Sequence, residues 1–202
     1  MIADEVLTGF GRTGRMFACE HSSVTPDIIC LSKGLTAGYL PMGATVATES
    51  IYDGFLSDDR EKTFFHGHSY TANPLACAVG LASLDLFRDE DVLGRIARLE
   101  TQLRLGFDSL RELPCVGDVR VIGGVGVAEL VSDREMKTGG GYFDQIGPQL
   151  ASAFLEQGLL IRPLGNLVYF MPPYVITEEE TVWALGTIKT VLAGVAQAGR
   201  AT

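Results

Sequence analysis

A lysine and an aspartate hold matching places in this sequence, each directly after a short apolar run. Lys33 follows the run at 27–32, and Asp4 follows residues 1–3. A lysine amine can form a Schiff base with an aldehyde, and a carboxylate can keep a pyridine nitrogen protonated. Pyridoxal phosphate carries both groups, so the pair predicts a site for this cofactor. Taken alone, Lys33 would be interpreted as a surface residue that caps a strand, and the surrounding sequence has to decide.

Composition excludes several classes of function. The chain has 202 residues, a hydrophobic content of 47% and a net charge of −9, which argues against a nucleic-acid or anionic-membrane partner. No apolar run reaches the length of a membrane span. The four cysteines, at positions 19, 30, 77 and 115, show no metal-like pair spacing. Reduced thiols in a cytoplasmic protein are therefore expected.

Alternating short strands and turns predict an α/β region over residues 1–90. Asn73 and Pro74 are typical of a helix start, since asparagine caps the first amides and proline is tolerated at the first helical position. The run that follows, 75–87, is apolar almost all round, which predicts a buried helix. The strands expected in this region are 1–6, 27–32 and 43–48, and a short helix is expected at 51–57.

Residues 91–202 have the pattern of a smaller α+β domain. Apolar residues recur at helical spacing between Val92 and Leu110, and Thr177 with Glu180 forms a capping box that announces the last helix. The triple glycine within 136–141 indicates a loop. A helix is expected at 143–154, and strands at 116–122, 125–131, 159–161 and 167–171. The buried face of the last helix is expected to comprise Val182, Leu185, Ile188, Val191 and Val195.

Gly9, Gly11 and Gly14 match the glycine spacing of a dinucleotide-binding turn. The context does not fit, because that turn should open a helix, whereas the residues after Gly14 lead quickly to Pro26. The acid also precedes the glycines instead of following them by about 20 residues. A nicotinamide-binding fold is therefore disfavoured.

Several of these segments together resemble the class III aminotransferases. The matching segments are 2–6, 9–14, 26–28, 32–35 and 73–76, and the likeness continues to the end of the chain. The resemblance implies a fold-type I, pyridoxal-phosphate-dependent α/β enzyme that works as a homodimer with shared active sites. Residues 1–90 would be part of its large cofactor-binding domain, and 91–202 its small C-terminal α+β domain.

The resemblance also assigns roles in cofactor binding. Lys33 would bind the cofactor and then move the proton during transfer, and Asp4 would pair with the pyridine nitrogen. His68 and Ser69 would reach the cofactor phosphate of the other subunit. Many family members carry threonine where Ser69 stands, which keeps the hydroxyl. The turn at 8–14 would either position Asp4 or contact the ligand directly.

Two further residues are assigned to substrate binding. Gly67 would leave room beside the substrate, where a Cβ would intrude. Arg162 would bind a substrate carboxylate through two parallel hydrogen bonds, since a planar guanidinium matches that geometry. His66 is expected to be a hydrogen-bonded loop residue.

Within the family, residues 66–74 and 161–174 resemble most closely the members that serve biotin biosynthesis. These transfer an amino group from S-adenosylmethionine to 8-amino-7-oxononanoate and form 7,8-diaminononanoate. An ω-amino acid or diamine aminotransferase is the alternative with the same chemistry.

The first strand begins at residue 1, so the chain is interpreted as the C-terminal portion of a longer enzyme. Family members carry the phosphate-cradling Gly-Ser segment and the ring-stacking aromatic residue in their N-terminal half. An inactive truncated fragment is therefore the alternative from a different functional class.

Overall fold

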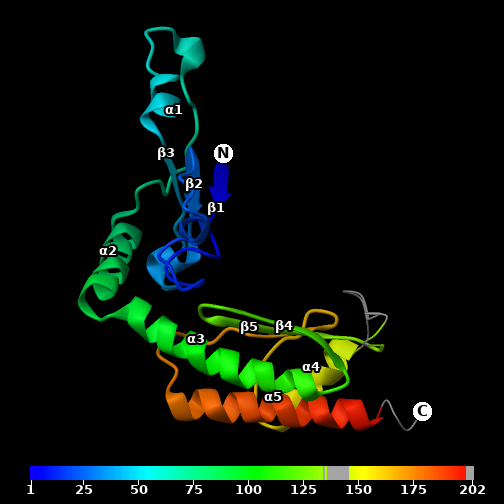
Figure 1. The fold of residues 1–202 in the computed structure, drawn as a ribbon. Coiled ribbons are helices and arrows are strands. Elements are labelled where there is room, and N and C mark those ends of the chain that lie inside the picture. Colours follow the sequence, from blue (N-terminus) through cyan, green and yellow to red (C-terminus); the bar gives the residue numbers. More distant parts are fainter. Residues whose placement is uncertain (134, 136–145, 199–202) are drawn as a thin grey trace. The chain divides into compact units, whose positions relative to one another are not determined.

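The structure, a computed structural model, describes residues 1–133, 135 and 146–198. Contacts divide the chain into two units, Met1–Gly94 and Arg95–Thr202 (Figure 1). The assignment of these units to the domains of a longer enzyme stays a prediction. The loop expected at 136–141 lies outside the described residues. Across the described part of the chain, no helix is both long and apolar enough to cross a membrane.

The first unit contains a three-stranded mixed sheet in the order β1-β2-β3. Strands β1 (Ile2–Asp4) and β2 (Ile28–Leu31) are parallel, and Asp4 lies opposite Cys30. Strand β3 (Ala44–Ala47) runs antiparallel to β2, with Leu31 opposite Ala44. All three strands expected from the sequence are confirmed. The carboxyl ends of β1 and β2 lie at the same edge of the sheet, because the two strands are parallel.

Short helices connect the strands of the first unit. They are η1 (Ala18–Ser22), η2 (Lys33–Thr36), α1 (Glu49–Asp53) and η3 (Arg60–Lys62). The helix expected at 51–57 is therefore shifted toward the N-terminus. Figure 1 shows that residues 49–70, called the arm below, project from the end of β3 before the chain returns to α2.

Helix α2 (Pro74–Asp89) begins as the sequence predicts. The Asn73 side chain accepts a hydrogen bond from the Leu75 amide at 3.0 Å, and Pro74 is the first helical residue. The expectation that this helix is buried on all sides is wrong, since Leu75 is 70% exposed and Leu81 64%. Its buried stripe consists of the small residues Ala76, Gly80 and Ser83.

The small stripe explains why the leucines of α2 face outward. A Cβ added at Gly80 would lie 3.6 Å from the Leu35 carbonyl oxygen, so the helix backbone packs closely on η2. Residues at helical positions i, i+4 and i+7 share one face, so close packing on this stripe turns the larger side chains away. Apolar content alone did not reveal which face is buried.

Within the described residues, the second unit holds an antiparallel sheet in the order β4-β5-β6 together with several helices. In β5 the buried residues alternate with partly exposed ones, as expected for a sheet that is covered on one face. The elements are α3 (Val92–Asp108), η4 (Ser109–Glu112), β4 (Val116–Ile122), β5 (Val125–Leu130), α4 (Ile146–Glu156), β6 (Leu167–Phe170) and α5 (Glu178–Ala198).

A hydrophobic core joins the helices of this unit to its sheet (Figure 1). Helix α3 packs against both β5 and α5: a Cβ at Gly126 would lie 2.4 Å from the Phe107 ring, and one at Gly106 would lie 2.5 Å from Leu185. The predicted apolar face of α3 is confirmed. Leu99, Leu103 and Phe107 of α3 belong to the core, and so does Leu110 in the following η4.

The last helix, α5, also begins as predicted. The Glu180 amide donates to Thr177 Oγ1 at 3.1 Å, and the Thr177 amide donates to Glu180 Oε2 at 2.9 Å, which completes the capping box. Val182 does not belong to the buried face, because it is 61% exposed. Thr181 and Ala184 occupy that face together with the predicted Ile188 and Val191.

The short strand expected at 159–161 does not form. The Leu159 amide donates to the Phe154 carbonyl oxygen at 2.9 Å, so this residue is hydrogen-bonded back to the last turn of α4 and not to a neighbouring strand. Pro163 then lacks an amide hydrogen for a strand ladder. The pairing that does form nearby is an isolated bridge between Leu164 and Leu167.

Candidate active site

Asp4 and Lys33 lie at the same edge of the first sheet. Asp4 ends β1 opposite Cys30, and Lys33 opens η2 three residues after Cys30. Both residues are exposed, and among the described residues neither takes part in an ion pair. Asp4 Oδ1 accepts a hydrogen bond from the Val6 amide at 3.0 Å. An acid and an amine thus follow neighbouring parallel strands, at the edge where open α/β sheets bind ligands.

Lys33 has an unusual backbone conformation. Its φ of 37° lies in the left-handed region, which residues with a Cβ rarely adopt. The residue before it, Ser32, is tied down by its side chain, which donates to the Met42 carbonyl oxygen at 2.6 Å. The chain therefore turns sharply at the end of β2, and it does so at the lysine itself.

Glu5 is a structural residue of this region that the sequence did not single out. It is 2% exposed, and its carboxylate accepts hydrogen bonds from the Thr8 hydroxyl, the Ala18 amide at 3.0 Å and the Cys19 amide at 2.8 Å. Burial by itself would raise the pKa of the Glu5 carboxyl, but these hydrogen bonds outweigh it and lower the pKa below its ordinary value. The charged Glu5 therefore fastens the turn that follows β1 to η1.

Glu5→Gln is expected to lower the free energy of unfolding by about 1–3 kcal/mol at neutral pH, because buried donors lose a charged acceptor. A lowered pKa means that the carboxylate stabilises the fold above its unfolded-state pKa, and that this stabilisation disappears as the pH falls through the folded-state pKa. The difference between the two proteins should therefore shrink in acid. Urea unfolding followed by circular dichroism at neutral and acidic pH measures it.

Glu49→Gln is the matched control for this measurement, since Glu49 is an exposed acid of the same unit. Its unfolding curve should match that of the unaltered protein at both pH values. A Glu5→Gln variant that is as stable as the control at neutral pH would show that the Glu5 hydrogen bonds contribute nothing.

The glycine-rich segment at 8–14 is a turn and opens no helix. Gly11 and Gly14 have φ values of 88° and 89°, and the Gly14 amide donates to the Gly11 carbonyl oxygen at 2.8 Å. A Cβ at Gly9 would lie 2.8 Å from the Glu5 carbonyl oxygen. The interpretation of these glycines as a tight turn next to Asp4 is confirmed, and the dinucleotide alternative fails. Direct contact between this turn and a ligand stays a prediction.

Gly67, His68 and Ser69 lie together on the arm, and all three are exposed. The His68 amide donates to Thr71 Oγ1 at 3.1 Å, and His68 Nδ1 accepts from the Tyr70 amide at 3.1 Å. A Cβ at Gly67 would meet only Thr71 Oγ1, at an ordinary 3.7 Å. This segment is thus fixed by its own hydrogen bonds, and its roles toward phosphate and substrate stay predictions.

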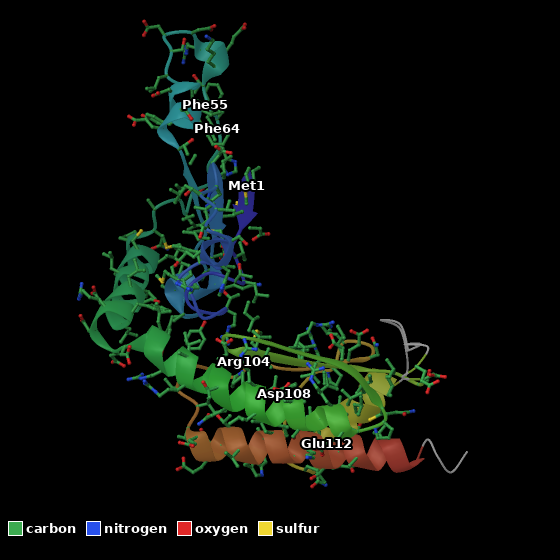
Figure 2. All side chains as sticks on the ribbon, viewed as in Figure 1. Met1, Phe55, Phe64, Arg104, Asp108 and Glu112 are labelled. Carbon is green, nitrogen blue, oxygen red and sulfur yellow. The ribbon has the colours of Figure 1, made fainter. Side chains whose placement is uncertain are left out.

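Aromatic side chains gather on the arm. The Phe55 and Phe64 rings, whose residues are labelled in Figure 2, have centroids 5.2 Å apart, and the His66 ring centroid lies 5.5 Å from that of Phe64. Phe65 and Tyr70 are also largely exposed. His66 is held within its own loop, where its amide donates to the Phe64 carbonyl oxygen at 2.9 Å.

Arg162 belongs to the second unit, in the connection between α4 and β6. It is exposed, whereas Pro163 beside it is buried and Ile161 packs against the core. The expected apolar flanks are therefore present. The binding of a substrate carboxylate by Arg162 stays a prediction.

The model of the class III aminotransferase family matches residues 1–192 of this chain. The chain belongs to the class III aminotransferase family. It is 51% identical, over 180 residues, to the adenosylmethionine-8-amino-7-oxononanoate aminotransferase of Synechococcus elongatus, and 50% identical, over 181 residues, to that of Geobacter sulfurreducens. These alignments cover 89% of this chain and 41% and 40% of the two relatives.

Solved structures of family members agree with this fold. The adenosylmethionine-8-amino-7-oxononanoate aminotransferase of Methanocaldococcus jannaschii matches with a TM-score of 0.90 and 41% identity, over 96% of this chain and 45% of that one. The taurine:2-oxoglutarate aminotransferase of Bifidobacterium kashiwanohense, solved with pyridoxal phosphate and glutamate, has a TM-score of 0.89 and 31% identity, over 98% of this chain and 44% of that one. The expected fold, part of a fold-type I aminotransferase, is confirmed. The chain spans less than half the length of these relatives.

Proposed function

We propose that this chain is the C-terminal part of a pyridoxal-phosphate-dependent enzyme that transfers an amino group from S-adenosylmethionine to 8-amino-7-oxononanoate, forming 7,8-diaminononanoate for biotin biosynthesis. The position of Asp4 and Lys33 at one edge of a parallel strand pair carries the chemical part of this proposal. The substrates are those in the name of its relatives, the adenosylmethionine-8-amino-7-oxononanoate aminotransferases, which are 40–51% identical to this chain. The four cysteines form no disulfide bond in the structure, and a cytoplasmic location is part of this proposal.

The residues present fit the cofactor that the family implies. Bound pyridoxal phosphate supplies an aldehyde that reacts with amines and a ring that withdraws electrons from the bonded carbon. Lys33 offers an exposed amine for the aldehyde, and Asp4 offers a carboxylate from the neighbouring strand for the pyridine nitrogen. Lys33 then acts as the base that moves a proton, while Asp4 keeps the nitrogen protonated.

A second copy of the protein completes the site in this proposal. The arm exposes Tyr52, Phe65 and Tyr70, which are large aromatic side chains typical of interface centres. On the same arm, His68 and Ser69 are exposed, and the Ser69 hydroxyl group is suited to donate a hydrogen bond to a phosphate. We expect the arm to contact the partner subunit and to bring these residues to its cofactor. Sedimentation of the intact protein, meaning the product of the whole reading frame that carries this chain, measures the assembly.

Initial rates of the intact protein test the proposed reaction. Formation of 7,8-diaminononanoate should give parallel double-reciprocal lines when both substrates are varied, because the amino group is held by the cofactor between two half-reactions. Intersecting lines would contradict this scheme. Activity with an ω-amino acid or a diamine, and none with S-adenosylmethionine, would favour the alternative substrate class.

Arg162→Gln is expected to raise KM for 8-amino-7-oxononanoate by about 10- to 100-fold, which corresponds to the loss of a charge-assisted contact. KM for S-adenosylmethionine should change little, so it serves as an internal reference for the change in KM for 8-amino-7-oxononanoate. Arg104→Gln is the control, because Arg104 is an exposed arginine of the same unit that pairs with Glu100. An equal rise of KM for both substrates would show that Arg162 does not recognise the keto substrate.

A further inference from the structure

We propose that Ser83 and Phe10 are positioning residues that clamp Gly34, the residue after Lys33, through two separate contacts and so fix the direction of the Lys33 amine. This inference rests on the proposed function, since it concerns the amine that binds the cofactor. Neither residue carries chemistry of its own, and neither was singled out by the sequence.

The turn at Lys33 requires such a clamp. Lys33 at the start of η2 has a φ of 37°, and Ala37 just after η2 has a φ of 51°. Lys33 and Ala37, which both have a Cβ, therefore adopt left-handed backbone conformations at the two ends of one short turn. Such conformations persist only where the surrounding structure enforces them, and they cluster at functional sites.

Ser83 supplies the first side of the clamp. It lies in the buried stripe of α2, is 6% exposed, and donates its hydroxyl to the Gly34 carbonyl oxygen at 3.2 Å, across 49 residues of sequence. The same carbonyl oxygen accepts the Ala37 amide at 3.1 Å, which closes the turn. The hydroxyl of Ser83 thus ties the Gly34–Leu35 peptide, one residue beyond Lys33, to helix α2.

Phe10 supplies the second side. A Cβ built on Gly34 would lie 2.7 Å from Phe10 Cβ and 3.0 Å from its ring, so the glycine backbone packs directly on this aromatic side chain. Phe10 is itself fixed, because its amide donates to the Met16 carbonyl oxygen at 2.7 Å and its ring meets that of Phe17 edge-on at 5.7 Å. Phe10 also belongs to the turn after Asp4, so it connects the segments that carry the acid and the amine.

The consequence is a fixed orientation of the lysine side chain. With either contact removed, the backbone of Lys33 is free to rotate about its N–Cα bond toward negative φ, where residues with a Cβ are more stable. This rotation changes the direction of the Cα–Cβ bond of Lys33 and displaces its amine. A small displacement of a reacting group lowers the rate strongly while binding is retained.

Ser83→Ala in the intact protein tests this proposal. We expect kcat to fall about tenfold, with KM for both substrates changed less than about twofold, since the loss affects the reacting geometry and not binding. The midpoint of the pH titration of cofactor absorbance should also move by about one pH unit. The free energy stored in one strained backbone residue is equivalent to a pKa difference of about that size. Ser83→Thr, which keeps the hydroxyl, should restore the midpoint.

Thr181→Val is the matched control, because Thr181 is fully buried in the second unit and donates to the Thr177 carbonyl oxygen at 2.8 Å. It should lower Tm but leave kcat and the titration midpoint unchanged.

Phe10→Leu loosens the other contact with Gly34 and should reproduce the effects of Ser83→Ala. If the Ser83→Ala protein does not fold, the Phe10→Leu protein tests the proposal in its place.

Two results would overturn the proposal, and they are distinguishable. An unaltered protein that binds the cofactor, together with Ser83→Ala and Phe10→Leu variants that keep its titration midpoint, would overturn the clamp alone. An unaltered protein with no absorbance band of bound cofactor would overturn the proposed function and the clamp with it.

Discussion

Lys33→Ala is expected to abolish covalent attachment of pyridoxal phosphate and to lower amino transfer by at least about 1000-fold, because the same amine binds the cofactor and moves the proton. Added cofactor should then show only the absorbance of the free aldehyde. Borohydride reduction followed by mass spectrometry should find the cofactor on the peptide that contains residue 33 in the unaltered protein and on no peptide in the variant.

Lys189→Ala controls for the loss of a lysine. Lys189 lies on α5, and its amine is 3.8 Å from the Glu112 carboxylate. This variant should keep both the absorbance band and the labelled peptide. A Lys33→Ala protein that still carries reduced cofactor at a specific lysine would place the attachment elsewhere and would remove the basis of the proposed function.

Asp4→Asn is expected to lower kcat about 100- to 1000-fold while cofactor attachment is retained, because a neutral amide cannot keep the pyridine nitrogen protonated. The asparagine oxygen can still accept the hydrogen bond that Asp4 Oδ1 receives from the Val6 amide. The local fold should therefore persist, and the loss should be chemical. Single-turnover rates with S-adenosylmethionine measure the first half-reaction directly.

A cofactor analogue methylated on the ring nitrogen sharpens this test, since its nitrogen is positive without any carboxylate. It should restore part of the rate in Asp4→Asn and give no gain in the unaltered protein. Asp89→Asn is the control, because Asp89 is exposed at the end of α2 and pairs with Arg88. An Asp4→Asn protein with an unchanged kcat would show that Asp4 does not pair with the pyridine nitrogen.

Local signals predicted most of the secondary structure. The caps at Asn73 and Thr177 work through side-chain bonds to amides within a few residues, so they can be identified without the fold. The strands of both sheets could be found for a similar reason, since each is a short apolar run bounded by turn residues. The order of the strands and their pairing did not follow from these signals.

Burial was harder to predict because it depends on distant partners. In α2 the leucines suggested a helix buried all round, whereas the face that packs on η2 consists of alanine, glycine and serine. Glu5 was missed for a related reason, since two of its donors are amides 13 and 14 residues away. The left-handed backbone at Lys33 also has no local sequence signal, because the residues that hold it come from separate segments.

The candidate site was therefore predicted by residue type and not by geometry. Asp4 and Lys33 stood out because each follows an apolar run, and parallel pairing of β1 with β2 brings both runs to one edge. The roles of His68, Ser69 and Arg162 came from the family resemblance, and the Arg162→Gln experiment tests the last of these roles.

Apolar burial is distributed unevenly between the two units. The first unit buries the apolar side chains of Phe10, Ala76 and Val92, whereas the hydrophobic cluster built around Phe107, Phe154 and Ile188 lies in the second. Hydration of newly exposed apolar surface dominates the heat capacity of unfolding. In a calorimeter, the second unit should therefore account for most of the heat-capacity increase when this chain melts.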